Sequence, residues 1–279
     1  MRIIKSYLQL ARLDKPAGIL LLLWPTLWAL WLATHGVPNI NLLVIFILGT
    51  IITRSAGCVI NDIFDRRFDQ KVTRTKQRPL ATSALSLKQA LFFLALLALL
   101  GLFLLCQLNM LSIKLGLLAA CIACIYPLMK RITYFPQVIL GIAFSMGIPM
   151  AFAACLNALP ARCWILFAIA ILWPIAYDTA YALVDAKDDQ NIGVKSTALF
   201  FKHHAILFIA ILQTIIIFGF IALGFLEHLS IIFYGAVALS ALLFFYQQKL
   251  LKTDRAFAAF LNNQWLGCII WLGIALGVS

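Results

Sequence analysis

Charged side chains are scarce in this sequence. Lys, Arg, Asp and Glu make up 11% of the 279 residues, whereas 64% of the residues are hydrophobic. A soluble domain of this length needs far more polar surface than this composition supplies. The apolar runs are about 20 residues long, which matches the hydrocarbon core of a bilayer. They are continuous and do not alternate as barrel strands do, so we predict an all-α, polytopic membrane protein.

Turn-forming residues between the apolar runs predict nine transmembrane helices. Their expected ranges are 17–34, 41–60, 88–107, 111–129, 136–155, 162–182, 204–224, 229–246 and 259–277. Residues 1–15 place apolar and basic side chains at helical spacing, which is typical of an interfacial helix and not of a cleavable signal. We therefore expect a single membrane domain over residues 1–279, with an interfacial helix over about residues 1–15.

The net charge of +12 is placed as in a membrane protein. Nearly all Lys and Arg residues fall in the N-terminal segment and in alternate loops, and the remaining loops hold Lys114 and Arg162. By the positive-inside rule, this asymmetry predicts a cytoplasmic N-terminus and an outer C-terminus in a bacterial inner membrane. The same placement favours contact with membrane lipid and argues against nucleic acid as a partner.

Acidic residues are rarer still, and seven of the ten lie in two clusters. The first holds Asp62, Asp65 and Asp69, and the second holds Asp178, Asp185, Asp188 and Asp189. The first cluster follows the second expected helix, and the second occupies the end of the sixth expected helix and the loop after it. The positive-inside rule places both on the cytoplasmic side. We therefore expect the two clusters to face one another.

Within each cluster, oxygen-bearing side chains recur every four residues, which places them on one face of a helix. They are Asn61, Asp65 and Asp69 in the first cluster, and Tyr181, Asp185 and Asp189 in the second. Like charges one helical turn apart repel, so a cation is expected to compensate them. Oxygen ligands without His or Cys favour Mg²⁺ over zinc or copper. The sequence therefore predicts a magnesium site. The alternative for each cluster is a solvated segment whose acids pair with Arg66, Arg67 and Lys187.

Basic residues complete a site for a diphosphate. Arg74 and Arg78 follow the first cluster, Lys195 follows the second, and Lys130 ends the fourth expected helix on the same side. Arginine is suited to bidentate contacts with phosphate, although each of these cations could also serve as a topology determinant.

Arg54 is different from these cations, because it lies inside an expected span. An arginine at the centre of a membrane helix costs about 2.5–3.5 kcal/mol on the insertion scale. It precedes Asn61 by seven residues and therefore points the same way. A role in the site is favoured over a structural ion pair.

These residues resemble the UbiA superfamily of intramembrane aromatic prenyltransferases, and the likeness covers nearly the whole chain. The segment from Asn61 to Asp69 is similar to the first signature of the family, and the segment from Tyr181 to Asp189 is similar to the second. Residues 12–16, 21–31, 54–62, 130–137 and 192–197 resemble the ubiquinone branch, whose acceptor is 4-hydroxybenzoate. Lys187 departs from this pattern, since close relatives often carry an acid there.

The resemblance implies nine helices in a ring around a central cavity, and transfer of a prenyl group from polyprenyl diphosphate to 4-hydroxybenzoate. It implies that Mg²⁺ is bound by Asn61, Asp65, Asp185 and Asp189, with Asp69 close by, and that Arg131 contacts substrate. The candidate catalytic residues are then Asp65, Asp69, Asp185, Asp189 and Arg131. The candidate substrate-binding residues are Arg54, Arg74, Arg78, Lys130, Tyr181 and Lys195.

Two other functions stay open at this point. The acceptor could be another aromatic compound used in the superfamily, such as dihydroxynaphthoate, homogentisate, haem b or chlorophyllide. The chain could instead be an ion-coupled secondary transporter, since intramembrane acids also mark carriers. The acids gather at one face of the membrane and not at its midplane, which favours the enzyme.

Overall fold

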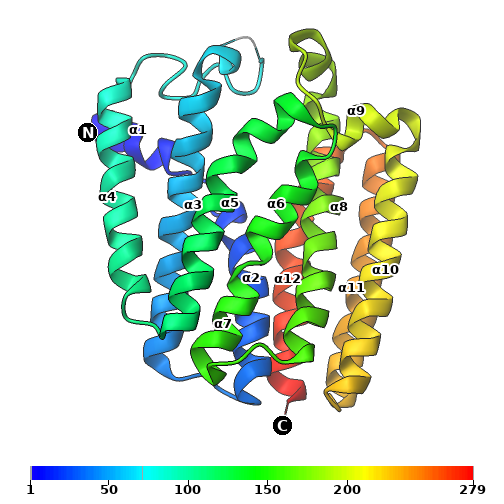
Figure 1. The fold of residues 1–279 in the computed structure, drawn as a ribbon. Helices are drawn as coiled ribbons and strands as arrows, with labels where there is room; N and C mark the ends of the chain where they lie inside the picture. Colours follow the sequence, from blue (N-terminus) through cyan, green and yellow to red (C-terminus); the bar gives the residue numbers. More distant parts are fainter. Residues whose placement is uncertain (1, 71, 279) are drawn as a thin grey trace.

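The computed structural model describes residues 2–70 and 72–278, and the regular structure in these ranges is helical throughout. Met1, Lys71 and Ser279 lie outside the described residues, as do the side chains of Arg2, Arg67 and Ile192. The expected pairing role of Arg67 therefore falls on a side chain that is not described. In Figure 1 the long helices stand side by side, with the N-terminus at one end of the bundle and the C-terminus at the other.

The helices follow one another with short connections. They are α1 (Arg2–Leu10), α2 (Ala17–Thr34), α3 (Ile40–Asp69), α4 (Leu87–Leu105), α5 (Met110–Ile132), α6 (Pro136–Ser145), α7 (Gly147–Leu156), α8 (Ala161–Ile192), α9 (Thr197–Phe201), the 3₁₀ helix η1 (Lys202–His204), α10 (Ala205–Leu226), α11 (Ile231–Lys252) and α12 (Ala256–Gly277). Within the described ranges, nine segments are long and apolar enough to cross a membrane, with α6–α7 and α9–α10 each counted as one. The predicted number of transmembrane helices is confirmed.

Two helices run further than their apolar sequence predicts. The helix α3 continues through the first acidic cluster to Asp69, and α8 continues through the second to Ile192. The expected loop position of Asp185, Asp188 and Asp189 was therefore wrong. The helix α8 ends where Gly193 takes a φ of 74°, a left-handed conformation that glycine adopts without strain.

Two shorter elements also differ from their expected ranges. The interfacial helix α1 ends at Leu10 instead of near residue 15, and Arg12 then takes a left-handed φ of 57°. The fifth span is divided at Met146 into α6 and α7. At this break Gly147 meets α2 so closely that a Cβ on it would overlap Oγ1 of Thr26.

The membrane helices pack as a closed series. Each of α2, α3, α5, α6, α8 and α12 contacts the next, and α12 returns to α2. The helix α4 packs on α3, and α10 and α11 pack on α8 and α12. The main core lies where α2, α8 and α12 meet, and fully buried Trp28 donates its indole N–H to the Gly267 carbonyl there at 3.0 Å. This order is consistent with the expected ring, and the central cavity stays a prediction.

Candidate active site

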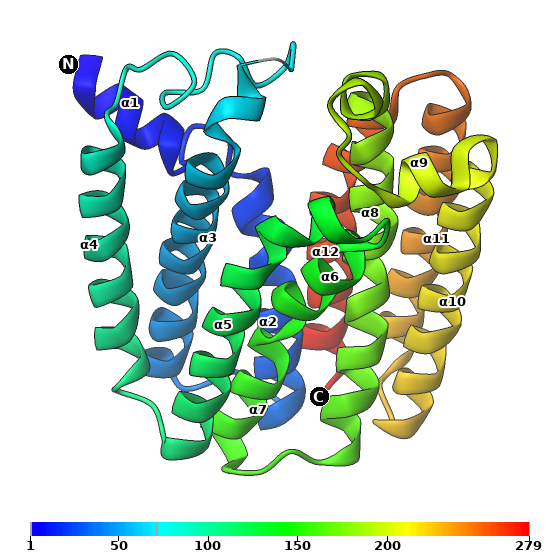
Figure 2. The same ribbon diagram turned by 45° about the horizontal axis from the view of Figure 1, so that its top comes forward.

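Asp62, Asp65 and Asp69 lie in the last turns of α3, and Asp185, Asp188 and Asp189 lie in the last turns of α8. The two helices end at the same end of the bundle (Figure 2). The chain that leaves α3 bridges to α8 at two points. The Arg74 side chain contacts Asp185, and the backbone N–H of Thr73 donates to Oδ2 of Asp188 at 3.1 Å. The structure therefore brings together the two clusters that the sequence separates by more than a hundred residues.

The first cluster is buried although all three of its side chains are acidic. Asp62, Asp65 and Asp69 are 1%, 3% and 5% exposed. The ammonium group of Lys130, on α5, pairs with Oδ2 of Asp65. The other oxygen of Asp65 is buried and has no hydrogen-bond partner among the described residues. A buried carboxylate oxygen without a partner is an open ligand position.

Asp62 holds three parts of the chain together. Both of its oxygens accept hydrogen bonds of 2.8 Å from Arg12, which follows α1, and Oδ1 also accepts from Arg78 at 3.0 Å. Arg78 reaches onward to both oxygens of Asp69, at 3.0 and 3.1 Å. Burial raises the pKa of the Asp69 carboxyl above its ordinary value, and the Arg78 charge opposes this. The network fixes α1 and the segment after α3 to the base of the site.

Replacing Asp62 with alanine is expected to lower the free energy of unfolding by about 3 kcal/mol, because Arg12 and Arg78 lose a buried partner. Thermal unfolding of the purified protein in detergent measures the change. Asp188→Ala is the matched control, since Asp188 is only partly buried and accepts one backbone hydrogen bond. Equal melting temperatures for the two variants would contradict the structural role of Asp62.

The second cluster is neutralised from across the site. Arg74 donates to Asp185 through Nε at 2.9 Å and through Nη2 at 2.5 Å, and its guanidinium lies 4.7 Å from the ring centre of Tyr181. Burial is the largest influence on Arg74 and acts to lower its pKa, but the hydrogen bonds to Asp185 together with the charges of Tyr181, Asp185 and Asp69 raise the pKa above its ordinary value. Asp189 lies within the electrostatic influence of Asp185, Lys130 and Arg74. Arg74 and Lys130 thus occupy the space between the clusters.

Arg131 and Lys195 fix the end of α5. Arg131 donates to the Phe64 carbonyl of α3 at 3.0 Å. Lys195 donates its backbone N–H to the Lys130 carbonyl at 2.8 Å and its ammonium to the Ile132 carbonyl at 3.1 Å. The structure therefore places both side chains on backbone carbonyls beside the site, where they position Lys130.

Arg54 lies deeper in the bundle, seven residues before Asn61 on α3. Its guanidinium is 5.5 Å from the ring centre of Phe144, and its buried Nε has no hydrogen-bond partner among the described residues. The buried hydroxyl of Tyr177 likewise has none, and it interacts electrostatically with Arg54. Two neighbouring polar groups without partners indicate a place for a polar ligand.

Other polar side chains lie around Arg54, and they are not among the site residues predicted from the sequence. Asp178 accepts a hydrogen bond from Gln137 and interacts electrostatically with Arg54, and Tyr126 also lies near Arg54. Asp178 carried a detectable signal, because it is an acid inside an apolar span two turns before Asp185. Tyr126 and Gln137 carried none, since polar side chains of this kind also serve ordinary packing.

The donor atoms fit Mg²⁺ better than any softer metal. Asn61, Asp65, Asp69, Asp185 and Asp189 offer oxygen only, and one oxygen of Asp65 is open. Among the described residues, no three His, Cys, Asp or Glu side chains converge tightly enough to hold an ion by themselves. An ion shared between the clusters would need further oxygens from a ligand, and a diphosphate supplies them. The acids pair with Arg12, Arg74, Arg78 and Lys130 and not with Arg66 or Lys187.

The described residues form nine candidate membrane helices with two facing Asp clusters, and comparison with known families agrees with this arrangement. The sequence profile of the UbiA prenyltransferase family covers residues 22–269, and the chain belongs to this family. It is 50% identical over 276 residues to the 4-hydroxybenzoate octaprenyltransferase of Hydrogenovibrio crunogenus, across 98% of this chain and 97% of the relative.

Solved structures show the same fold. A UbiA homolog from Aeropyrum pernix K1, in its apo form, has a TM-score of 0.82 at 24% identity and covers 91% of this chain and 96% of its own. A UbiA homolog from Archaeoglobus fulgidus bound to GPP and Mg²⁺ has a TM-score of 0.68 at 20% identity and covers 98% of each chain. Together with the nine spans, these likenesses establish a multi-pass membrane protein of the UbiA fold.

Proposed function

We propose that this chain transfers a polyprenyl group from polyprenyl diphosphate to the aromatic ring of 4-hydroxybenzoate, with release of diphosphate, in ubiquinone biosynthesis. The observation that carries the proposal is the position of the two Asp clusters directly across from one another, above Arg54, whose buried Nε has no hydrogen-bond partner among the described residues. The near full-length identity to a 4-hydroxybenzoate octaprenyltransferase supports the same substrates.

The clusters form the donor end of the site. Asn61, Asp65, Asp69, Asp185 and Asp189 would hold Mg²⁺, an ion that is bound in the solved structure of the homolog from Archaeoglobus fulgidus. When bound, Mg²⁺ supplies positive charge that stabilises the leaving diphosphate. Arg74, Arg78 and Lys130 lie between and beside the carboxylates, so each can turn from its aspartate to a phosphate oxygen.

The deeper layer forms the acceptor end. The guanidinium of Arg54 suits the carboxylate of 4-hydroxybenzoate, because a planar bidentate ion pair satisfies both buried partners. Asp178 lies close enough to Arg54 to interact with it and is our candidate for the base that takes the ring proton. The ring of the acceptor would then lie between Arg54 and the donor end.

Aromatic side chains gather beside Tyr181, whose ring contacts Arg74 at the donor end. The ring of Tyr181 lies 4.8 Å from that of Phe260 and 6.1 Å from that of Phe257, measured between centroids. Cleavage of the C–O bond leaves positive charge on the allylic carbon, which the faces of such rings stabilise. The electron-rich ring carbon of the acceptor then forms the new C–C bond, and loss of its proton restores aromaticity.

We also propose that the chain is one domain over residues 1–279 in a bacterial inner membrane, with its N-terminus and Asp clusters in the cytoplasm. The distribution of Lys and Arg between alternate loops supports this orientation. Cysteine labelling from outside the cell tests it. A single cysteine beside Lys114 is expected to react, and one beside Lys187 is expected to remain protected.

The activity is tested in membranes that contain the protein, supplied with 4-hydroxybenzoate and a polyprenyl diphosphate. A 3-polyprenyl-4-hydroxybenzoate is expected by mass spectrometry with Mg²⁺ and is expected to be absent with EDTA. Product with another aromatic acceptor and none with 4-hydroxybenzoate would correct the substrate. Counterflow of a solute in vesicles without any prenylated product would support the transporter instead.

A further inference from the structure

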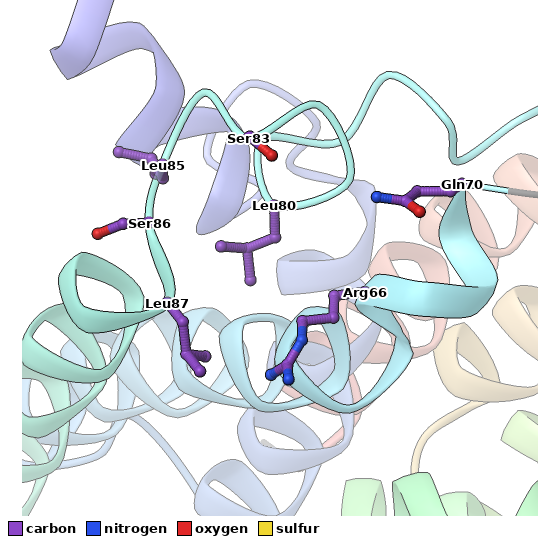
Figure 3. A pocket seen from close by; sticks show the side chains of 7 residues that line it. All are labelled: Arg66, Gln70, Leu80, Ser83, Leu85, Ser86 and Leu87. Carbon is purple, nitrogen blue, oxygen red and sulfur yellow. The ribbon is translucent and has the colours of Figure 1, made fainter.

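A hollow lies between the end of α3, the segment 80–86 and the start of α4 (Figure 3). It encloses about 410 Å³, within the range of about 300–1,000 Å³ that is typical of ligand sites. Its lining combines Arg66, the two serines Ser83 and Ser86, and a leucine wall that includes Leu80 and Leu85. The proposed reaction uses none of these side chains.

Arg66 differs from the neighbouring arginines in that it forms no ion pair among the described residues. Arg12, Arg74 and Arg78 all form ion pairs with aspartates, whereas no carboxylate of the described residues pairs with Arg66. Arg66 lies one helical turn after Asp62, but Arg12 already holds both oxygens of that aspartate. In Figure 3 the side chain of Arg66 extends along the hollow toward the start of α4.

The hollow lies at the level where two helices leave the membrane. The helix α3 ends at Asp69, one turn after Arg66, and the apolar helix α4 begins at Leu87, which also lines the hollow. Beyond Leu87, the side chains of Leu91 and Phe92 on α4 are 48% and 74% exposed, as expected of a surface that faces lipid. The hollow therefore opens toward the headgroup layer of the bilayer.

The lining suits the phosphate group and the first part of the acyl chains of a phospholipid. A guanidinium binds phosphate through two parallel hydrogen bonds. The hydroxyl of Ser83 is free to bond a polar headgroup, and that of Ser86, which accepts from the backbone of Gln89, can still donate. The buried side chains of Leu80 and Leu85 offer an apolar floor to the first methylenes.

We propose that this hollow binds the headgroup of an anionic phospholipid, with its phosphate on Arg66 and its headgroup hydroxyls on Ser83 and Ser86. Basic pockets between membrane helices on the cytoplasmic side are suited to such headgroups. The bound lipid neutralises the charge of Arg66 and fills the hollow between α3 and α4. This site is separate from the Asp clusters and does not depend on the proposed reaction.

Native mass spectrometry of the full-length protein tests the proposal. The protein is released from nanodiscs of phosphatidylcholine that contain a small fraction of phosphatidylglycerol, and the retained lipid is identified. Wild type is expected to retain phosphatidylglycerol, and Arg66→Gln is expected to retain at least about tenfold less, since the charge-assisted contact to phosphate is lost. Lys88→Gln is the matched control, because Lys88 is an exposed cation next to Leu87 that does not line the hollow.

A second variant tests the hollow without removing Arg66. Ser83 has a φ of 60°, which aspartate tolerates, so Ser83→Asp preserves the backbone while it repels phosphate and pairs with Arg66. It is expected to lose the lipid as Arg66→Gln does. Wild-type retention in both variants would overturn the proposal, as would an equal loss in Lys88→Gln. Displacement of the lipid by millimolar inorganic phosphate would show an anion site that does not select lipid.

Discussion

Asp185→Asn is expected to insert and fold as the wild type does, yet to lose prenyl transfer by a factor of at least about 10³. The substitution keeps the size and one acceptor oxygen of the side chain, so the contact with Arg74 persists in weaker form. It removes one negative charge from the cluster that faces Asp65, and with it a ligand that we assign to Mg²⁺. Initial rates across a range of Mg²⁺ concentrations measure the effect.

The neighbouring acid provides the matched control for this variant. Asp188→Asn removes a charge three residues away, and an asparagine oxygen can still accept from the backbone of Thr73. We expect its rate to stay within a few-fold of wild type. If saturating Mg²⁺ restored full activity to Asp185→Asn, or if Asp188→Asn lost as much, the bridging role of Asp185 would be wrong.

Arg54→Gln is expected to raise the KM for 4-hydroxybenzoate by about 10- to 100-fold and to leave the KM for the prenyl diphosphate nearly unchanged. The reason is geometric, because Arg54 lies below the donor end and its Nε has no hydrogen-bond partner among the described residues. Arg54 forms no ion pair among the described residues, so its replacement is expected to lower the melting temperature by less than the loss of Asp62 does. Loss of acceptor affinity without a comparable loss of stability would separate a binding role from a structural one.

The sharpest version of this experiment compares two acceptors. In 4-hydroxybenzamide a neutral amide replaces the carboxylate with almost the same shape. Wild type is expected to prefer the acid strongly, and Arg54→Gln is expected to use the two acceptors about equally well. If the variant kept the preference for the acid, the carboxylate would have to bind elsewhere in the site.

The parts of this site that follow from helical geometry were predictable from the sequence. Asn61, Asp65 and Asp69 share a face because of their spacing alone, and Arg54 was placed on that face by the same count. An arginine inside an apolar span is rare enough to indicate a function without any knowledge of its neighbours.

Contacts between distant segments were not predictable. In the sequence, Asp62 cannot be distinguished from the other acids of its cluster. Its ion pair with Arg12 could be predicted only from the position of the segment after α1. Lys195 reads as a phosphate ligand, yet its ammonium lies on the Ile132 carbonyl. The break at Met146 lies where Gly147 packs closely against Thr26 on another helix. A hydropathy pattern describes one segment at a time and cannot predict such a contact.

The length of α3 has a consequence for where the products go. Its 30 residues span roughly 45 Å at 1.5 Å per residue, whereas the hydrocarbon core is about 30 Å thick. The carboxylates at its end therefore extend beyond the hydrocarbon core toward water, while the polyprenyl chain remains among the lipid acyl chains. Diphosphate can diffuse into the aqueous phase as the new lipid drifts away sideways. Because the two products enter different phases, they rarely meet again at the site, and this disfavours the reverse reaction.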